Sequence, residues 1–312
     1  MRASAGGESL NQGRSRTHVN ALSSCLHATI YILMQRSFGR DIALIIFKAV
    51  VVVVTIFAII GTITFFYETD LGISDGICNV AVLPVEGEIW PYYGLTDAPL
   101  IVTPEAIETF FSTAEADESI EAVLIEVNSP GGTPVAAERI AHRLRSSTKP
   151  VVGMIGDIGA SGGYMIAAAS DYLIASPMSM VGSIGVTMSY LEYSQQNEDS
   201  GIEYVELNTG KFKNSGSPDK ALTDEERELF QRDLDEIHTE FVNMVAKYRN
   251  LPEEKVRELA DGSTLNGVRA REAGLVDEVG GRAEAKNALA TLLQKDPNDI
   301  VFCEYESPLL PF

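Results

Sequence analysis

The sequence predicts an α/β domain with a largely parallel sheet, preceded by one membrane-spanning helix. Two observations lead to this prediction. An uncharged apolar run stands near the N-terminus of the 312-residue chain. After it, apolar stretches with strand character alternate with segments of helical period, which is typical of βαβ units. The chain is long enough for one large domain with a substantial core.

The membrane helix is predicted from residues 49–66, AVVVVVTIFAIIGTITFF. As a helix these residues would span about 27 Å. A buried helix or a β-rich segment is the alternative, but a core helix would normally show a polar face, which is absent here. Basic residues precede the run and Glu68, Asp70 and Asp75 follow it. The positive-inside rule therefore places the N-terminus in the cytoplasm and the body outside.

We accordingly expect three segments. Residues 1–41 form a cytoplasmic N-terminal segment, residues 42–67 the transmembrane anchor, and residues 68–312 an extracytoplasmic domain. No small-x-small cleavage site follows the apolar run, so the anchor is expected to stay uncleaved. Residues 1–33 do not resemble a folded domain, and we expect the natural protein to begin at Met34. An intact mass that includes the preceding residues would contradict this.

Charge is distributed unevenly along the chain. Residues 1–67 carry six Lys or Arg and two acids, whereas the remainder carries 18 basic and 42 acidic residues. So acidic a body argues against binding to nucleic acid, which needs basic surface. The three cysteines, Cys25, Cys78 and Cys303, have no metal-site spacing. Cys78 and Cys303 could pair outside the cytosol, but two unpaired thiols are the expectation.

The pattern of the body predicts alternating elements followed by a long helix. Strands are expected at 79–85, 120–127, 149–155, 172–175 and 185–189, and helices at 104–114, 134–145 and 161–169. A long amphipathic helix opens at Thr223, with Glu226 completing a capping box. Its apolar stripe consists of Phe230, Leu234, Ile237, Phe241 and Val245.

Two glycine-rich segments follow predicted strands: NSPGG at 128–132 and GASGG at 159–163. Paired glycines leave backbone N–H groups accessible, as an oxyanion hole requires. A tight turn is the alternative for the first segment. In the second, Ser161 is either a helix N-cap or a nucleophile at a helix N-terminus. Because both segments would meet at one edge of a parallel sheet, they favour a site.

Other kinds of site are not supported by the sequence. His18 and His27 precede the anchor, and His142 and His238 lie singly on helices, where a solvated side chain is expected. A Ser-His-Asp triad is therefore not predicted, nor is a metal site or a phosphate-binding loop. A serine nucleophile would then need a lysine base. The segment before the long helix offers three whose spacing does not decide among them: Lys211, Lys213 and Lys220.

Five motifs lie within about residues 80–285, in the order NSPGG, GASGGYMIAAASD, SMVGSIGV, GKFKNSGSP and NGVRAREAGLVDEVGG. Together they resemble the signal peptide peptidase A family of membrane-anchored serine proteases. The resemblance implies that Ser161 is the nucleophile and Lys213 the general base. It further implies oxyanion donors at Gly132 and Gly162, and a supporting hydroxyl at Ser183 that binds the base. The long N-terminal extension departs from the family pattern.

The same resemblance implies a fold and partners. The fold would be the Clp protease and crotonase spiral of βαβ units, in the short single-domain form. A homo-oligomeric ring is expected, in which adjacent protomers supply the base and the nucleophile. The substrates would be signal peptide remnants or other membrane-associated peptides, with no cofactor. The alternatives are a non-catalytic ring scaffold, a crotonase-type acyl-CoA enzyme, or a protease that acts on membrane or misfolded proteins.

Overall fold

The computed structural model describes residues 42–60, 76–94 and 100–304. The chain divides into two units, Met1–Leu71 and Gly72–Phe312. The described part of the first unit is one exposed apolar helix, Ile42–Ile60, which is long enough to cross a membrane. The rest of the expected anchor and Met34 lie outside the described residues.

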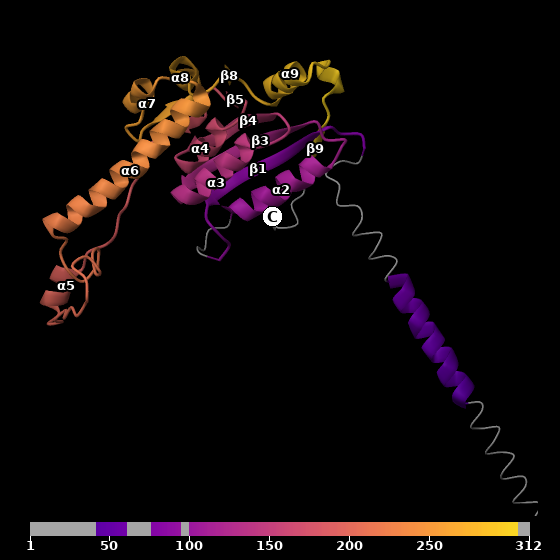
Figure 1. Cartoon of the computed structure of the whole chain (residues 1–312), viewed down its shortest axis with the longest axis horizontal. Coiled ribbons are helices and arrows are strands. Elements are labelled where there is room, and N and C mark those ends of the chain that lie inside the picture. The colour runs from indigo at the N-terminus through magenta and orange to yellow at the C-terminus, as the bar shows by residue number, and fades with distance from the viewer. Residues whose placement is uncertain (1–41, 61–75, 95–99, 305–312) are drawn as a thin grey trace, which may run out of the picture. The chain divides into compact units, whose positions relative to one another are not determined.

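The second unit is built on a largely parallel sheet (Figure 1). Its central strands run in the order β1, β3, β4 and β5, and the shorter strands β2 and β9 pair with β1 while β8 pairs with β5. Within the described residues, only β6 and β7 pair in antiparallel fashion. The strands are β1 (Val80–Ile89), β2 (Ile101–Val102), β3 (Ala122–Gly132), β4 (Val151–Ala160), β5 (Tyr172–Ala175), β6 (Met180–Gly182), β7 (Thr264–Asn266), β8 (Glu278–Val279) and β9 (Phe302–Glu304). The predicted α/β class is confirmed.

Helices cover both faces of this sheet (Figure 1). Side chains that alternate along each strand point to opposite faces. On β1, Ala81 and Leu83 join the core formed with α2, α3 and α4, whereas Val80 and Val82 pack in a second cluster with α9. The helices are α2 (Pro104–Ala116), α3 (Pro134–Arg145), α4 (Gly162–Ala168) and α9 (Arg282–Leu293). Both faces of the central strands are therefore buried, as parallel sheets require.

The remaining helices are α5 to α8 and a short 3₁₀ helix after α9. Among them, α6 leads away from the sheet, contacts α7 and has α5 near its far end (Figure 1). The predicted capping box is confirmed: the Thr223 hydroxyl accepts from the Glu226 N–H at 3.2 Å, and the Glu226 carboxylate accepts from the Thr223 N–H at 3.0 Å. These elements are α5 (Ser194–Asp199), α6 (Asp224–Arg249), α7 (Glu253–Leu259), α8 (Gly267–Ala273) and the short 3₁₀ helix Pro297–Asp299.

The apolar stripe of α6 is buried only in its C-terminal half. Phe241 and Val245 are core residues, but Ile237 is 39% exposed. The apolar stripe of an amphipathic helix usually packs against the core along its whole length. Its N-terminal half instead faces open space beside α3 and α4, described below.

The predicted strand at 185–189 is wrong. The strand in this region is β6, Met180–Gly182, which pairs with the far half of β4. After β6 the chain leaves the sheet, and Thr187 and Met188 are exposed. The short apolar run that predicted a strand here is therefore not part of the core.

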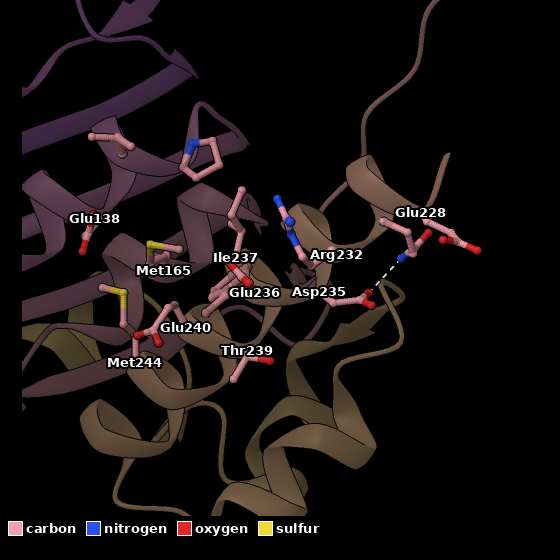
Figure 2. A pocket seen from close by; sticks show the side chains of 14 residues that line it. Glu138, Met165, Glu228, Arg232, Asp235, Glu236, Ile237, Thr239, Glu240 and Met244 are labelled. Carbon is pink, nitrogen blue, oxygen red and sulfur yellow. Dashed lines mark hydrogen bonds between the residues drawn. The ribbon is translucent and has the colours of Figure 1, made fainter. Parts of the chain in front are cut away.

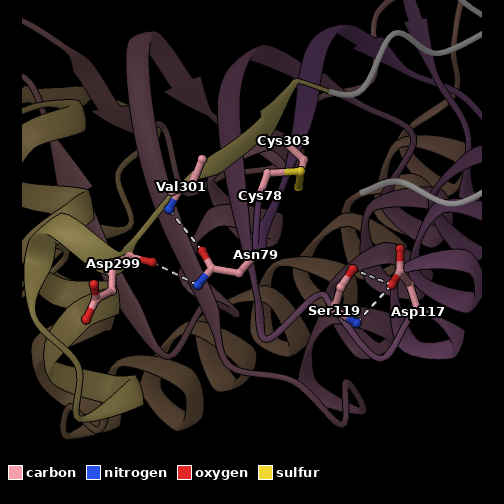
Figure 3. The surroundings of a disulfide bond; sticks show 7 residues. All are labelled: Cys78, Asn79, Asp117, Ser119, Asp299, Val301 and Cys303. Carbon is pink, nitrogen blue, oxygen red and sulfur yellow. Dashed lines mark hydrogen bonds between the residues drawn. A yellow bond between two sulfur atoms is a disulfide. The ribbon is translucent and has the colours of Figure 1, made fainter. Parts of the chain in front are cut away.

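Cys78 and Cys303 form a disulfide, so the expected unpaired thiols are wrong (Figure 3). Their Cα atoms are 5.2 Å apart although 225 residues separate them in sequence. The pairing follows from β9, which lies parallel to β1 with Ala81 opposite Cys303. Next to the disulfide, the Asn79 side chain donates to the Asp299 carbonyl at 2.9 Å and accepts from the Val301 N–H at 2.9 Å. The C-terminal strand is thus held to β1 by a covalent bond and by hydrogen bonds.

Candidate active site

The two glycine-rich segments lie side by side as extensions of β3 and β4. β3 continues through NSPGG to Gly132, and Ser129 pairs with Gly159 of β4 after a register shift. NSPGG is therefore part of a strand and not the tight turn considered above. Gly131 has a φ of +107°, and a Cβ there would lie 2.8 Å from both the Gly162 nitrogen and the Ser161 Cβ. Real side chains do not tolerate such contacts, so glycine is required where the two backbones touch. The expected meeting of the segments at one sheet edge is confirmed.

Ser129 fixes the position of NSPGG against β1. Its fully buried hydroxyl donates to the Gly87 carbonyl at 2.6 Å and accepts from the Gly131 N–H at 3.2 Å. A side chain that binds backbone groups on both sides leaves the chain little freedom. The amide of Gly132, which follows Gly131 in the sequence, is therefore held in a defined orientation.

Ser161 has a strained backbone and a hydroxyl that caps nothing. Its φ is +51° and its ψ −125°, while its N–H donates to the Gly182 carbonyl at 2.8 Å. Ser161 occupies the N-cap position of α4, but its side chain makes no capping hydrogen bond, so capping does not explain the serine. A non-glycine residue in such a conformation costs about 1–3 kcal/mol, and strain of this kind concentrates at functional sites.

The amides of Gly132 and Gly162 lie close together beside Ser161. A Cβ on Gly162 would lie 3.4 Å from the Gly132 nitrogen and 3.0 Å from the Ala137 Cβ. Gly162 is the first residue of α4, where N–H groups lack an intrahelical acceptor and the helix dipole favours negative charge. The arrangement can hold an anion next to the serine hydroxyl, as the stabilisation of a tetrahedral intermediate requires.

Ser161, Gly132 and Gly162 line a cleft of about 620 Å³, here called the Ser161 cleft. Ser183 also lines this cleft. It follows Gly182 in the sequence, and Gly182 of β6 pairs with Ala160 of β4. The Ser183 hydroxyl donates to the Gly262 carbonyl at 3.0 Å. A hydrogen bond from Ser183 to a base lysine stays a prediction.

The three candidate lysines lie in residues 186–222, here called the lysine segment, and differ in their partners. Lys211 pairs with Glu225 at 2.6 Å, and Lys220 pairs with Glu206 at 3.1 Å and Glu226 at 2.9 Å. Hydrogen bonds that Lys220 donates to Glu226 and then to Glu206 raise the pKa of Lys220, so its amine stays protonated and cannot accept a proton from a serine. Lys213 is exposed, and no ion pair to it occurs among the described residues. Lys213 does not line the Ser161 cleft of its own chain.

His238 is not the solvated side chain that its helical position suggested. It is half-buried, lines the Ser161 cleft, and its Nε2 atom is buried without a hydrogen-bond partner. Asp235 and Asp261 line the same cleft. The sequence contained one signal for His238, because it lies four residues after Leu234 and three before Phe241, at the edge of the apolar stripe.

A second hollow of about 1090 Å³, here called the acidic groove, lies between α3, α4 and α6 (Figure 2). It shares Met165, Ile237 and Phe241 with the Ser161 cleft. Arg232 lies in the groove but pairs with Asp233 at 2.6 Å. Five carboxylates of the groove have no ion pair among the described residues: Glu138, Glu228, Asp235, Glu236 and Glu240. The groove thus combines apolar side chains with uncompensated negative charge.

Comparison with known proteins gives a consistent result. Residues 143–296 match the model of "Peptidase family S49". A Methanocaldococcus jannaschii protein named "Putative protease" is 39% identical over 189 residues, 60% of this chain and 61% of its own length. A Synechocystis protein of the same description is 33% identical over 232 residues, 70% of this chain and 83% of its own. The Enterococcus faecium "Putative signal peptide peptidase SppA" is 35% identical over 201 residues, 64% and 58% of the two chains.

The chain thus spans about three fifths of the length of the archaeal and Enterococcus relatives and most of the cyanobacterial one. The match to the family model begins in α3, runs through Ser161 and the lysine segment, and ends just after α9. The chain therefore belongs to peptidase family S49, the signal peptide peptidase A family, whose fold is that of the Clp protease and crotonase proteins.

Proposed function

We propose that the protein is a membrane-anchored serine endopeptidase with Ser161 as nucleophile and Lys213 as general base. The observation that carries the proposal is the conformation of Ser161. Its backbone is strained, its hydroxyl caps nothing, and two glycine amides stand next to it. A serine that served only packing would not need this strain.

In the proposed mechanism, the Ser161 Oγ attacks the carbonyl carbon of a peptide bond while Lys213, in its neutral form, accepts the hydroxyl proton. The Gly132 and Gly162 N–H groups donate to the oxyanion of the tetrahedral intermediate. The intermediate collapses as the Lys213 ammonium protonates the leaving amine, which departs and leaves an acyl-enzyme. Water, deprotonated by Lys213, then attacks the ester and releases the acid product and Ser161.

A second copy of the chain would supply the lysine. Lys213 lies outside the Ser161 cleft of its own chain, on a segment rich in exposed apolar side chains. Patches of this kind usually mark interfaces. The exposed large apolar residues of the lysine segment are Met188, Tyr190, Leu191, Tyr193, Ile202, Tyr204, Val205, Leu207 and Phe212. Docking of this segment against a neighbouring copy would bury them and desolvate Lys213, which favours the neutral amine. In a homo-oligomeric ring, every Ser161 cleft would receive Lys213 from a neighbouring protomer.

The acidic groove supports a substrate class. A peptide with apolar residues and nearby Lys or Arg would bury its apolar side chains against Met165, Ile237 and Phe241. Its basic groups would meet the unpaired carboxylates. Cleaved signal peptides have this composition and lie at the membrane, so they and similar membrane-associated peptides are the proposed substrates. The same carboxylates would repel the phosphates of coenzyme A, which weighs against acyl-CoA chemistry.

The helix Ile42–Ile60 would anchor the protein, with the N-terminus in the cytoplasm and the catalytic domain outside. The disulfide between Cys78 and Cys303 supports this orientation, because disulfides persist mainly outside the cytosol. The orientation would be tested directly by adding a protease to sealed vesicles and measuring whether it cleaves the N-terminal segment or the catalytic domain.

The proposal is tested with the full chain in detergent, a panel of fluorogenic peptides and a serine-directed covalent probe. We expect hydrolysis, best for apolar peptides with a basic residue, and labelling of Ser161. Ser161→Ala should lose more than about 10⁴-fold in activity and all labelling. Ser146→Ala, a matched change at an exposed hydroxyl that binds the Arg143 carbonyl, should keep both. A chain that folds and assembles but neither hydrolyses peptide nor reacts with the probe would favour the non-catalytic scaffold.

A further inference from the structure

We propose that His238 binds the main chain of the peptide substrate beside Ser161, through a hydrogen bond made by its Nε2 atom. This inference rests on the proposed function and adds a substrate-binding residue to it. His238 lies on α6 and lines the same cleft as the two glycine-rich segments. The mechanism proposed above assigns it no role.

The first observation is the state of the imidazole. Its Nε2 is buried from solvent and has no hydrogen-bond partner in the described structure. Buried polar atoms are nearly always paired, because an unpaired one loses its bonds to water and gains nothing. The free protein therefore carries an unfavourable free energy at this atom that a bound ligand could remove.

The second observation is its location. His238 lines the same cleft as Ser161 and Gly132, and neighbours the shared residues Ile237 and Phe241 that lead into the acidic groove. A peptide whose scissile bond lies at Ser161 and whose chain continues along α6 would pass the imidazole. Because Nε2 is buried in the free protein, the ring would turn this atom toward the cleft as the peptide binds. Each peptide unit offers both a carbonyl acceptor and an N–H donor, so either tautomer of the imidazole would find a partner.

A role as general base fits less well. A base is expected to be hydrogen-bonded to the nucleophile and oriented by a third group. The Nε2 atom makes no hydrogen bond to the Ser161 hydroxyl. Asp235, one turn earlier on α6, accepts a hydrogen bond from the Gln231 side chain at 2.8 Å. Within the described residues, no hydrogen bond joins a carboxylate to the Nε2 atom of His238. The geometry points to binding, and the two roles predict different kinetics.

The experiment compares His238→Phe with His238→Gln in the full chain, using the peptide panel. Phenylalanine removes Nε2 and keeps the ring, whereas glutamine returns a polar group at a similar distance from the backbone. We expect His238→Phe to raise KM about tenfold with kcat within about twofold, since one hydrogen bond is lost in ground state and transition state alike. His238→Gln should recover most of the loss. His142→Phe, the same change on an exposed face of α3, should have no effect.

The KM increase should be similar for every peptide of the panel, because the proposed contact is to the main chain. An increase confined to peptides with a particular polar side chain would overturn that assignment. A loss of kcat of about 10² or more in both His238 variants would make the residue a catalytic base instead. An unchanged KM in His238→Phe would refute binding altogether.

Two further measurements separate this inference from the proposed function. Thermal unfolding of His238→Phe should show a midpoint equal to or above that of the wild type, because an unpaired buried polar atom has been replaced by an apolar ring. Peptide affinity measured in the Ser161→Ala background should fall about tenfold when His238 is also changed to Phe. If no variant hydrolyses peptide, the proposed function fails, and this affinity still decides the role of His238.

Discussion

The Ser161 cleft and the lysine segment differ in how completely one chain determines them. Around Ser161, contacts between β3, β4 and β1 position the backbone of the two glycine-rich segments, and Ser129 is fully buried. The lysine segment holds one short helix, exposes its apolar side chains, and leaves Lys213 without an ion pair among the described residues. One half of the proposed dyad is thus preorganised within the chain, and the other half is presented outward.

This difference indicates what each half of the site requires. Preorganised amides stabilise an oxyanion without reorganisation, so they belong in the rigid core. A lysine base must lose water to become neutral at ordinary pH, and an exposed lysine has not lost it. We infer that activity requires burial of the lysine segment, which a second copy would provide.

The largest expected effect separates the lysines within the segment. Lys213→Ala should lose about 10⁴-fold or more in peptide hydrolysis, because the proposed general base is removed. Lys211 lies two residues away, carries the same charge and pairs with Glu225. Lys211→Ala should therefore keep the activity within a few-fold of the wild type. Initial rates on one fluorogenic peptide measure both. Equal losses in the two variants would mean that the segment contributes charge rather than a base.

A smaller effect belongs to the rigid half. Replacing Cys303 by Ser removes the bond that holds β9 to β1 and should lower the free energy of unfolding by about 2–5 kcal/mol. Denaturant unfolding of the wild type and the variant measures this. Activity well below the unfolding temperature should persist, because neither Ser161 nor Lys213 contacts the disulfide. Unchanged stability in the variant would show that the covalent tie contributes nothing to the rigidity of this half.

The smallest effect concerns the junction of the two regions at the start of α6. Hydrogen bonds from the Thr223 N–H and then from Lys220 lower the pKa of Glu226 from 4.5 to about 2. Because the native pKa is the lower one, the ionised carboxylate stabilises the fold above pH 4.5, and this contribution disappears as the pH falls toward 2. Glu226→Gln should therefore be less stable than the wild type at pH 7, and the difference should shrink across that interval. Urea titrations at several pH values test this, and a constant difference would contradict it.

The sequence predicted those features that depend on local pattern. The alternating elements, the capping box of α6 and the paired glycine segments follow from spacing alone, and all are present except the strand predicted at 185–189. The features it missed depend on contacts between distant parts of the chain. The disulfide requires β9 to lie beside β1, and the continuation of β3 through NSPGG requires its pairing with β1 and β4.

His238 and Lys213 show the same limit at the site itself. The helical pattern placed His238 at the edge of an apolar stripe, but only the packing of α6 against α4 shows that this edge lines the Ser161 cleft. For Lys213 the motif supplied the residue, whereas the place where it acts depends on what covers the lysine segment. Neither spacing nor propensity carries that information.

The most direct test of the central claim is complementation between two inactive chains. Ser161→Ala and Lys213→Ala are coexpressed with different tags, and assemblies that carry both tags are purified. If neighbouring copies share the dyad, the mixed assembly should recover about a quarter of wild-type activity, because random arrangement joins an intact serine to an intact lysine at about one site in four. Mixed assemblies that stay as inactive as either variant alone would contradict a site shared between copies.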